Sequence, residues 1–229
     1  MGIKKNDKQA KKRYFLHGGD YNPEQWRETP EILREDLRLM QKAKCNTFSV
    51  GIFSWSVLEP RDGEYDFSIL DETIANLASI GAKINLSTPS AAMPYWMAAK
   101  YPEIMKVTAE GVRKKFGGRQ NFCPTSPVYR EKVREINEKL SERYGRNENV
   151  LLWHVSNEYY GEPCYCALCK AKFGEFLKRR YGTIGRLNRE YWTTFWSHTY
   201  SSFEEVEPNG VMGVQLVINK HTRESHEVK

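Results

Sequence analysis

One carboxylate closes an apolar run in a position that suits proton transfer. The run starts at Leu151 and ends in the string WHVSNE, so that Asn157 and Glu158 follow a strand-like segment. A carboxylate at the end of a buried strand is partly removed from water, which raises its pKa and lets it hold a proton near neutral pH. The amide of Asn157 can donate a hydrogen bond to a sugar hydroxyl. An Asn-Glu pair alone is common on surface loops, but its place after this run favours Glu158 as a proton donor.

A cluster of cysteines suggests a second kind of chemistry. Cys164, Cys166 and Cys169 form a C-x-C-x-x-C string, and Cys123 lies upstream. Four thiolates suit a closed tetrahedral zinc site, and the absence of a histidine or carboxylate from the set predicts a structural metal rather than a catalytic one. The alternative is that these are ordinary reduced thiols. Cys45, in a helix-to-strand joint, is predicted to be a core thiol.

The segments that would position these groups alternate between strand-like and helix-like patterns. Short apolar runs predict strands at residues 14–19, 47–50, 83–87 and 150–155. Apolar residues at helical spacing predict helices at residues 30–44, 68–80, 126–144 and 166–181. Ser126 followed by Pro127 is a helix start signal for the third of these. Four strand–helix units in a row predict parallel strands joined by crossover helices.

Two architectures share this alternation. An open doubly wound sheet would need a Gly-rich phosphate turn after its first strand, but Gly18 and Gly19 are followed by DYNP, without a third glycine or a helix start. In a (β/α)8 TIM barrel, by contrast, active-site residues gather at the carboxyl ends of the strands. Polar and aromatic side chains do follow the predicted strands: Asp20, Trp55, Glu59, Ser90, Asn157 and Glu158. A complete barrel typically needs ~250 residues, so only about the first four βα units are expected here.

Charge and composition exclude several classes of protein. The net charge is +6, and basic residues crowd the segment 1–13, which is predicted to be a solvated tail. No nucleic-acid-binding motif accompanies this charge, so nucleic acid is not an expected partner. No apolar stretch reaches the roughly 20 residues that span a membrane, and no secretory signal is visible. The cytoplasm is therefore the expected location, and disulfides are not expected there.

Several strings in the chain resemble glycoside hydrolase family 42, the β-galactosidases with (β/α)8 barrels. They are HGGDYNPEQW (17–26), GIFSWSVLEPRDGEYDF (51–67), STPSAAMPYWM (87–97), RQNFCPTSPVYR (119–130) and WHVSNEY (153–159). The cysteine cluster is similar to that family's zinc site. The resemblance runs from about Tyr14 to about Pro208 and is lost in residues 209–229, which are predicted to be an aberrant or non-family tail.

The resemblance implies a role for each matching residue. Glu158 would be the acid/base, Asn157 its sugar-binding neighbour and Arg119 a galactose-contacting arginine. Zinc would be held by the four cysteines at positions 123, 164, 166 and 169. The substrate would be a β-galactoside, and the family tends to form homotrimers.

The family's nucleophile, a glutamate at the end of the seventh strand, matches no position in this sequence. The chain is therefore expected to be the N-terminal half of a retaining β-galactosidase barrel and to be inactive alone. Two alternatives remain open. One is a non-catalytic galactoside-binding module stabilised by zinc, and the other is a truncated product without function.

Overall fold

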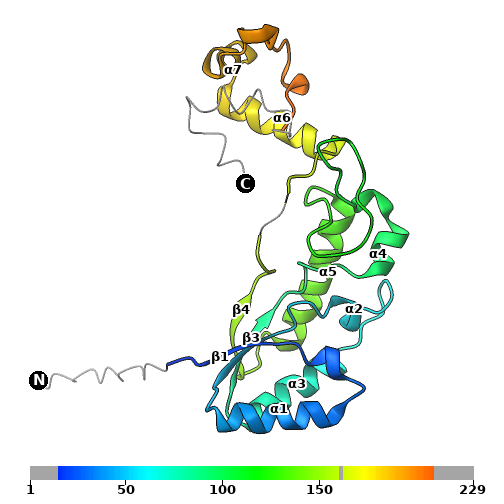
Figure 1. Cartoon of the computed structure of the whole chain (residues 1–229), viewed down its shortest axis with the longest axis vertical. Helices are drawn as coiled ribbons and strands as arrows, with labels where there is room; N and C mark the ends of the chain where they lie inside the picture. Colours follow the sequence, from blue (N-terminus) through cyan, green and yellow to red (C-terminus); the bar gives the residue numbers. More distant parts are fainter. Residues whose placement is uncertain (1–14, 160–161, 209–229) are drawn as a thin grey trace, which may run out of the picture.

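The computed structural model describes residues 15–159 and 162–208, in which four parallel strands form one sheet (Figure 1). The strands are β1 (Gly18–Tyr21), β2 (Thr47–Val50), β3 (Lys83–Ser87) and β4 (Val150–His154), and they lie in the order of the sequence. All three pairings are parallel, so β1 and β4 are the edges of the sheet. This arrangement confirms the predicted partial (β/α) barrel. The segments 1–13 and 209–229 of the predicted organisation lie outside the described residues.

Helices join the strands and continue beyond them. The crossover helices are α1 (Pro30–Lys42), α3 (Ser68–Ser79) and α5 (Pro127–Tyr144), with α2 (Trp55–Leu58), α4 (Tyr95–Lys100), η1 (Pro23–Trp26) and η2 (Pro102–Ile104) in the loops. After β4 come α6 (Ala167–Tyr181), α7 (Ile184–Tyr191), η3 (Phe195–Ser197) and η4 (Phe203–Glu205). The predicted cap is present, because the Ser126 hydroxyl accepts a hydrogen bond of 3.3 Å from the Tyr129 N–H. Among the described residues, no helix has both the length and the apolar character that a membrane span requires.

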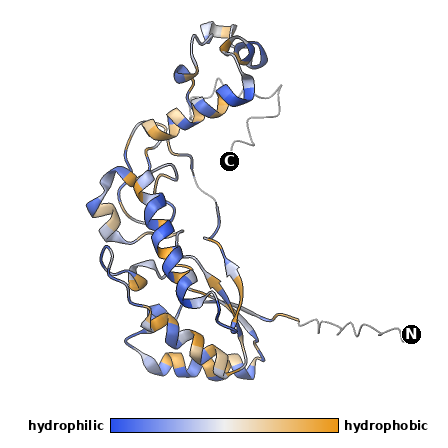
Figure 2. Cartoon of the chain, turned by 180° about the vertical axis from the view of Figure 1, so that it is seen from behind, coloured by the Kyte–Doolittle hydropathy of each residue, from blue (hydrophilic) through white to orange (hydrophobic). Residues whose placement is uncertain are grey.

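The main core lies between the sheet and the helices on one of its faces. Phe48, Val50, Ile84 and Leu86 of the two central strands are buried there, and the residues of α3 and α5 that pack with them include Ile74, Leu77, Ile136 and Leu140. Figure 2 shows these helices alternating hydrophobic and hydrophilic residues, as expected when one helix face packs on a sheet. The edge strands differ: β1 is largely exposed, and Leu151 and Leu152 of β4 stay 47% and 53% exposed. Burial therefore falls off toward both edges of the sheet.

A second, smaller core belongs to the helices after β4. It consists of Leu177, Tyr181, Leu187, Phe203 and Val206, which are buried among α6, α7 and η4. In Figure 1 this unit lies at the far end of the molecule from the sheet. The contacts that join it to the rest of the chain include those of the thiol cluster described below.

The first strand begins later than predicted. Residues 14–19 were the expected strand, whereas β1 spans Gly18–Tyr21 and pairs Asp20 with Ser49. Asp20 therefore lies within the sheet rather than after it. The hydrogen-bonded register with β2 decides the boundary, and the apolar residues Phe15 and Leu16 remain 86% and 46% exposed outside it.

Gly18 allows β1 to approach β2 closely. A Cβ atom at this position would lie 1.6 Å from the carbonyl oxygen of Thr47, whereas one at Gly19 would meet nothing within 4 Å. Because the clash is with backbone, Gly18→Ala is expected to lower the free energy of unfolding by about 3 kcal/mol or more. Urea unfolding followed by tryptophan fluorescence measures this. Gly19→Ala is the matched control, and equal loss in both variants would contradict the close contact.

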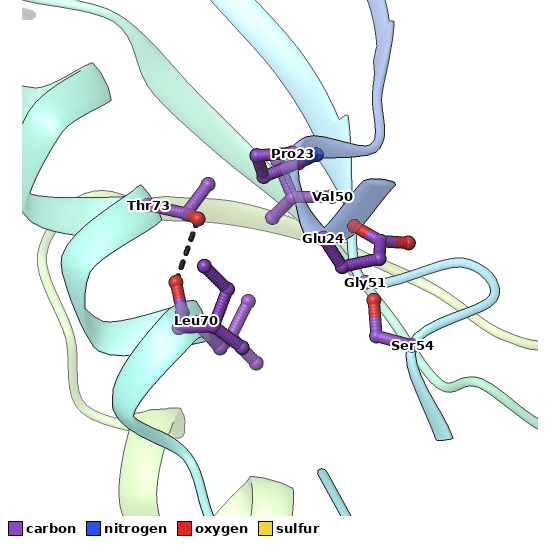
Figure 3. A pocket seen from close by; sticks show the side chains of 8 residues that line it. Pro23, Glu24, Val50, Gly51, Ser54, Leu70 and Thr73 are labelled. Carbon is purple, nitrogen blue, oxygen red and sulfur yellow. Dashed lines mark hydrogen bonds between the residues drawn. The ribbon is translucent and has the colours of Figure 1, made fainter. Parts of the chain in front are cut away.

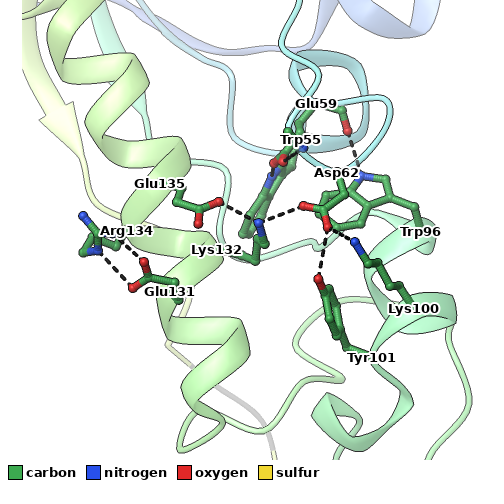
Figure 4. Close-up of polar contacts among 11 residues, drawn as sticks. Trp55, Glu59, Asp62, Trp96, Lys100, Tyr101, Glu131, Lys132, Arg134 and Glu135 are labelled. Atoms are coloured by element: carbon green, nitrogen blue, oxygen red, sulfur yellow. Dashed lines mark hydrogen bonds and ion pairs between the residues drawn. The ribbon is translucent and has the colours of Figure 1, made fainter.

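A polar network ties the loop after β2 to α4 and α5 (Figure 4). The Asp62 carboxylate pairs with Lys100 at 2.5 Å and with Lys132 at 2.8 Å, and it accepts a hydrogen bond from Tyr101. Nearby, Glu59 is fully buried and accepts hydrogen bonds from the Trp55 indole at 2.7 Å and from the backbone of Gly63. Trp55 and Glu59 are expected near the barrel mouth from the sequence. Both are buried, Trp55 as part of the main core and Glu59 as its hydrogen-bond partner.

The network makes stability depend on pH. Partial burial raises the pKa of Asp62, but hydrogen bonds from Lys100, Lys132 and Tyr101 outweigh burial and lower the pKa from 3.8 to about 2. Because the pKa of Asp62 is lower in the folded state, its ionised carboxylate stabilises the fold at pH values above the ordinary pKa of 3.8. This stabilisation is lost as the pH falls toward 2. Asp62→Asn is thus expected to cost about 1 kcal/mol at neutral pH after allowance for solvent screening.

The difference in free energy of unfolding between wild type and Asp62→Asn should shrink between pH 4 and pH 2. Unfolding curves at several pH values would measure this. Glu64→Gln is the control, because the Arg61–Glu64 pair is exposed at 77% and 60% of its side chains and such pairs contribute little. If the free energies of unfolding of wild type and Asp62→Asn differed by the same amount across this pH range, the lowered pKa of Asp62 would be contradicted.

Candidate active site and thiol cluster

The backbone turns sharply after β4 and so directs Glu158 away from the sheet. Ser156 and Glu158 have φ angles of 57° and 42°, in the left-handed region that is unusual for residues with a Cβ. The Ser156 N–H donates to the Thr88 hydroxyl at 2.7 Å, and the Thr88 N–H donates to the carbonyl of His154 at 2.9 Å. These bonds join the carboxyl ends of β3 and β4 and hold the strained turn in place.

Three residues singled out from the sequence come together at this turn. The Arg119 guanidinium donates to the Glu158 carboxylate and lies 5.2 Å from the centre of the Phe53 ring. Gln120 donates through its side-chain amide to the carbonyl oxygens of both Asn157, at 3.0 Å, and Glu158. Arg119 and Glu158 are therefore in direct contact, and Gln120 binds the backbone of Asn157 and Glu158 beside them. Gln120 was not predicted, because a side chain that binds backbone carbonyls leaves no recognisable motif.

A polar cavity of about 440 Å³ opens beside Glu158. Its walls come from the segment before α5 and from the chain after β4, and they consist of Lys106, Lys114, Gly117, Arg119, Gln120, Asn121, Glu158 and Glu162. Lys114 pairs with Glu162 at 2.6 Å, so each carboxylate of the cavity has a cationic partner. A cavity of this size can hold a small polar ligand such as a sugar.

The expected burial of Glu158 is not found. Its side chain is 60% exposed, and Arg119 is its ion-pair partner. An apolar run predicts a buried strand, but Trp153 and Val155 are themselves 38% and 61% exposed. The run is apolar, yet in the described residues the outer edge of β4 is uncovered. Desolvation of Glu158 therefore has no structural basis in this arrangement.

The four cysteines also meet, as the spacing predicted. The Sγ atoms of Cys123, Cys164, Cys166 and Cys169 all lie within 4.8 Å of one another. Cys123 precedes α5, Cys164 and Cys166 precede α6, and Cys169 lies in the first turns of α6. Four thiolates at ~2.3 Å from one zinc ion would be ~3.8 Å apart, and the Cys123 sulfur lies 3.5 Å and 3.4 Å from those of Cys166 and Cys169. The donor set and its spacing therefore fit a tetrahedral metal site.

Local hydrogen bonds favour the thiolate form at one of these sulfurs. The Cys123 thiol and the backbone N–H groups of Val107 and Cys166 lower the pKa of Cys164 to about 4, against the effect of burial. The Val107 N–H lies 3.5 Å from the Cys164 sulfur. Burial raises the pKa of Cys169 to about 11. Cys164 is thus stabilised as a thiolate, whereas other thiols of the cluster resist ionisation. A bound cation is needed if all four sulfurs are to ionise together.

A second cavity lies between η1, the end of β2 and α3 (Figure 3). Pro23, Glu24, Gly51 and Ser54 lie at its rim, and its volume is about 10 Å³. That space holds no more than one water molecule, although burial raises the pKa of Glu24. The cavity beside Glu158 is therefore the better candidate for a substrate.

Comparisons with known proteins agree with one another. The sequence model of glycoside hydrolase family 42, described as beta-galactosidase, matches residues 20–224. Beta-galactosidase BglY of Alicyclobacillus acidocaldarius is 54% identical over 193 residues, which cover 84% of this chain and 28% of the relative. Beta-galactosidase GanA of Bacillus subtilis is 49% identical, with 88% and 31% covered.

A solved structure gives the same result. Gan42B, a GH42 beta-galactosidase from G. stearothermophilus, superposes with a TM-score of 0.84 at 49% identity, over 87% of this chain and 29% of that one. The chain thus spans less than a third of the length of these relatives.

Proposed function

The chain belongs to glycoside hydrolase family 42, and on that premise we propose that Glu158 is the general acid/base of a retaining β-galactosidase. The observation that carries this is the Glu158–Arg119 pair beside a polar cavity at the carboxyl end of β4, where Gln120 also binds the backbone of Asn157. This is the end of the strands at which (β/α)8 barrels place their catalytic groups. The substrate is a terminal β-D-galactoside.

The reaction needs two carboxyl groups. In a retaining glycosidase they stand ~5–5.5 Å apart. One attacks the anomeric carbon while Glu158 gives its proton to the leaving oxygen, and Glu158 then takes a proton from the water that releases galactose. In this proposal the second carboxylate comes from a part of the barrel outside the described residues. Among the described residues, the other carboxylate of the cavity, Glu162, is engaged by Lys114.

Arg119 has two successive partners in this scheme. In the described state it pairs with Glu158. Galactose hydroxyls in the cavity then compete with Glu158 for the guanidinium of Arg119. The Glu158 carboxyl group is then released from the ion pair and can face the leaving oxygen.

The test is an assay with a nitrophenyl β-galactoside. The 229-residue chain alone is expected to give no turnover. Co-expression with the complementary C-terminal part of a relative such as GanA is expected to restore it. Turnover by the chain alone that Glu158→Gln abolishes would contradict a shared site. Galactose binding without turnover in either preparation would favour a non-catalytic galactoside-binding module.

We also propose that Cys123, Cys164, Cys166 and Cys169 hold one structural zinc ion. The close spacing of the four sulfurs supports this, and so does the resemblance to a zinc-binding family. When bound, zinc supplies a cross-link and no step of the reaction, because four protein ligands leave no open position. The cross-link joins the loop before α5 to α6 and its small core.

We further propose the cytoplasm as the location. All five cysteines of the described residues are free thiols, and a four-thiol metal site requires reduced cysteines. A reducing compartment maintains them. Separation of cell extracts, followed by detection of the chain with an antibody, tests this.

A further inference from the structure

Lys106 is a buried cation that pairs with no carboxylate among the described residues. Its residue is 8% exposed, and its ammonium donates to the backbone carbonyl of Glu162 at 2.8 Å. The Glu162 carboxylate is engaged by Lys114 instead. A buried ammonium bonded to a neutral carbonyl carries a large desolvation cost unless negative charge lies nearby.

The backbone around Lys106 contacts the thiol cluster, which is a candidate for that charge. The N–H of the next residue, Val107, donates to the Cys164 sulfur, and the N–H of Lys106 itself donates to the carbonyl of Asn121 at 2.9 Å, two residues before Cys123. Four thiolates outweigh the charge of one Zn²⁺, so the loaded site is net negative. Burial and then Lys114 lower the pKa of Lys106, whereas the negative charges of Cys164, Glu162 and Cys123 oppose that shift.

The same segment reaches the acid/base. Residues 106–123 carry Lys106, Arg119 and Gln120 of the cavity wall and Cys123 of the sulfur cluster. Arg119 binds the Glu158 carboxylate, and Gln120 binds the carbonyl of that residue. A displacement at the sulfur cluster is therefore transmitted along a short stretch of chain to the groups that hold Glu158.

We propose that Lys106 is a positioning residue that balances the charge of the metal site and links its integrity to the geometry around Glu158. This deepens the proposed function and rests on it, since the charge to be balanced is that of the zinc tetrathiolate. Lys106 touches neither the metal nor the reacting bond. It acts through the Glu162 carbonyl and through the segment that contains Arg119 and Gln120.

The experiment compares Lys106→Met, Lys106→Arg and Lys114→Met in the zinc-loaded 229-residue chain. Lys114→Met is the matched control, because it removes the same charge from the same cavity and contacts the same glutamate. Zinc release to a chromophoric chelator gives the first readout, and tryptic cleavage after Arg119, followed by mass spectrometry, gives the second. The Co²⁺-substituted variants report by their absorption spectra whether the four-sulfur site is intact.

Lys106→Met is expected to release zinc about 10- to 100-fold faster, as for other groups that support metal ligands, and to be cut faster after Arg119. Lys106→Arg should restore both rates, and Lys114→Met should leave zinc release unchanged. Equal rates in Lys106→Met and Lys114→Met would overturn the inference while leaving the zinc proposal standing. A wild-type chain that takes up no zinc would overturn both.

Discussion

Cys164→Ser is expected to abolish stoichiometric zinc binding and to lower the Tm of the chain by about 6–12 °C. Structural zinc contributes about 10–16 kcal/mol in small zinc-binding domains. A loss of only about 3 kcal/mol would move Tm by this amount in a chain of this size. Cys164 is the most damaging choice, because it is buried and its pKa is the one that its neighbours lower. A hydroxyl in its place does not ionise and leaves a buried cluster with three thiols.

Metal analysis and thermal melting with and without a chelator measure this effect. Cys45→Ser is the control, since Cys45 is half-buried and lies outside the cluster. That variant should retain zinc and should respond to the chelator as wild type does. A wild-type chain whose Tm is insensitive to the chelator, with Cys164→Ser melting at the same temperature, would refute a structural metal.

Glu158→Gln is expected to lower the turnover of the reconstituted galactosidase by about 10²- to 10⁴-fold for alkyl or phenyl galactosides. An amide preserves the shape and hydrogen-bonding reach of the side chain but has no proton to give to the leaving oxygen. The loss should be much smaller for a dinitrophenyl galactoside, whose leaving group departs without protonation. Dependence of the loss on the leaving group distinguishes a proton donor from a residue that only binds substrate.

Steady-state kinetics with a graded series of aryl galactosides supply this measurement. Glu162→Gln is the matched control, because it removes a second carboxylate from the same cavity, one that pairs with Lys114. Its loss should be small and independent of the leaving group. Equal losses across the aryl series for Glu158→Gln, or a larger loss for Glu162→Gln, would remove Glu158 from the acid/base role.

Much of the scaffold follows from local patterns. Strands β2 and β3 have the predicted bounds, because each is a short β-branched or apolar run between clear breaks. The Ser126 cap of α5 was predicted from two residues and is present. The sulfur cluster was predicted from ligand spacing, which constrains where the chain can place four thiols. In each case, the determining interactions are local or involve side chains of unusual chemistry.

The remaining features depend on contacts between distant segments. The start of β1 is set by pairing with β2, so a run of apolar residues misplaced it. The exposure of Glu158 depends on what covers β4, which composition does not specify. Gln120 and Lys106 bind backbone carbonyls of residues 157, 158 and 162. A carbonyl has no sequence identity, and the geometry that selects these two side chains is visible only in three dimensions.

The exposed strand β4 affects the solubility of the chain. Exposed apolar side chains lie along this edge strand and just after it: Leu151, Leu152, Trp153 and Val155. Such an edge is a template for self-association. The net charge of +6 opposes this by repulsion between molecules. Salt screens that repulsion within about 8 Å at physiological ionic strength. The solubility of the chain is therefore a balance between one bare strand and its basic surface, and it should fall as salt is added.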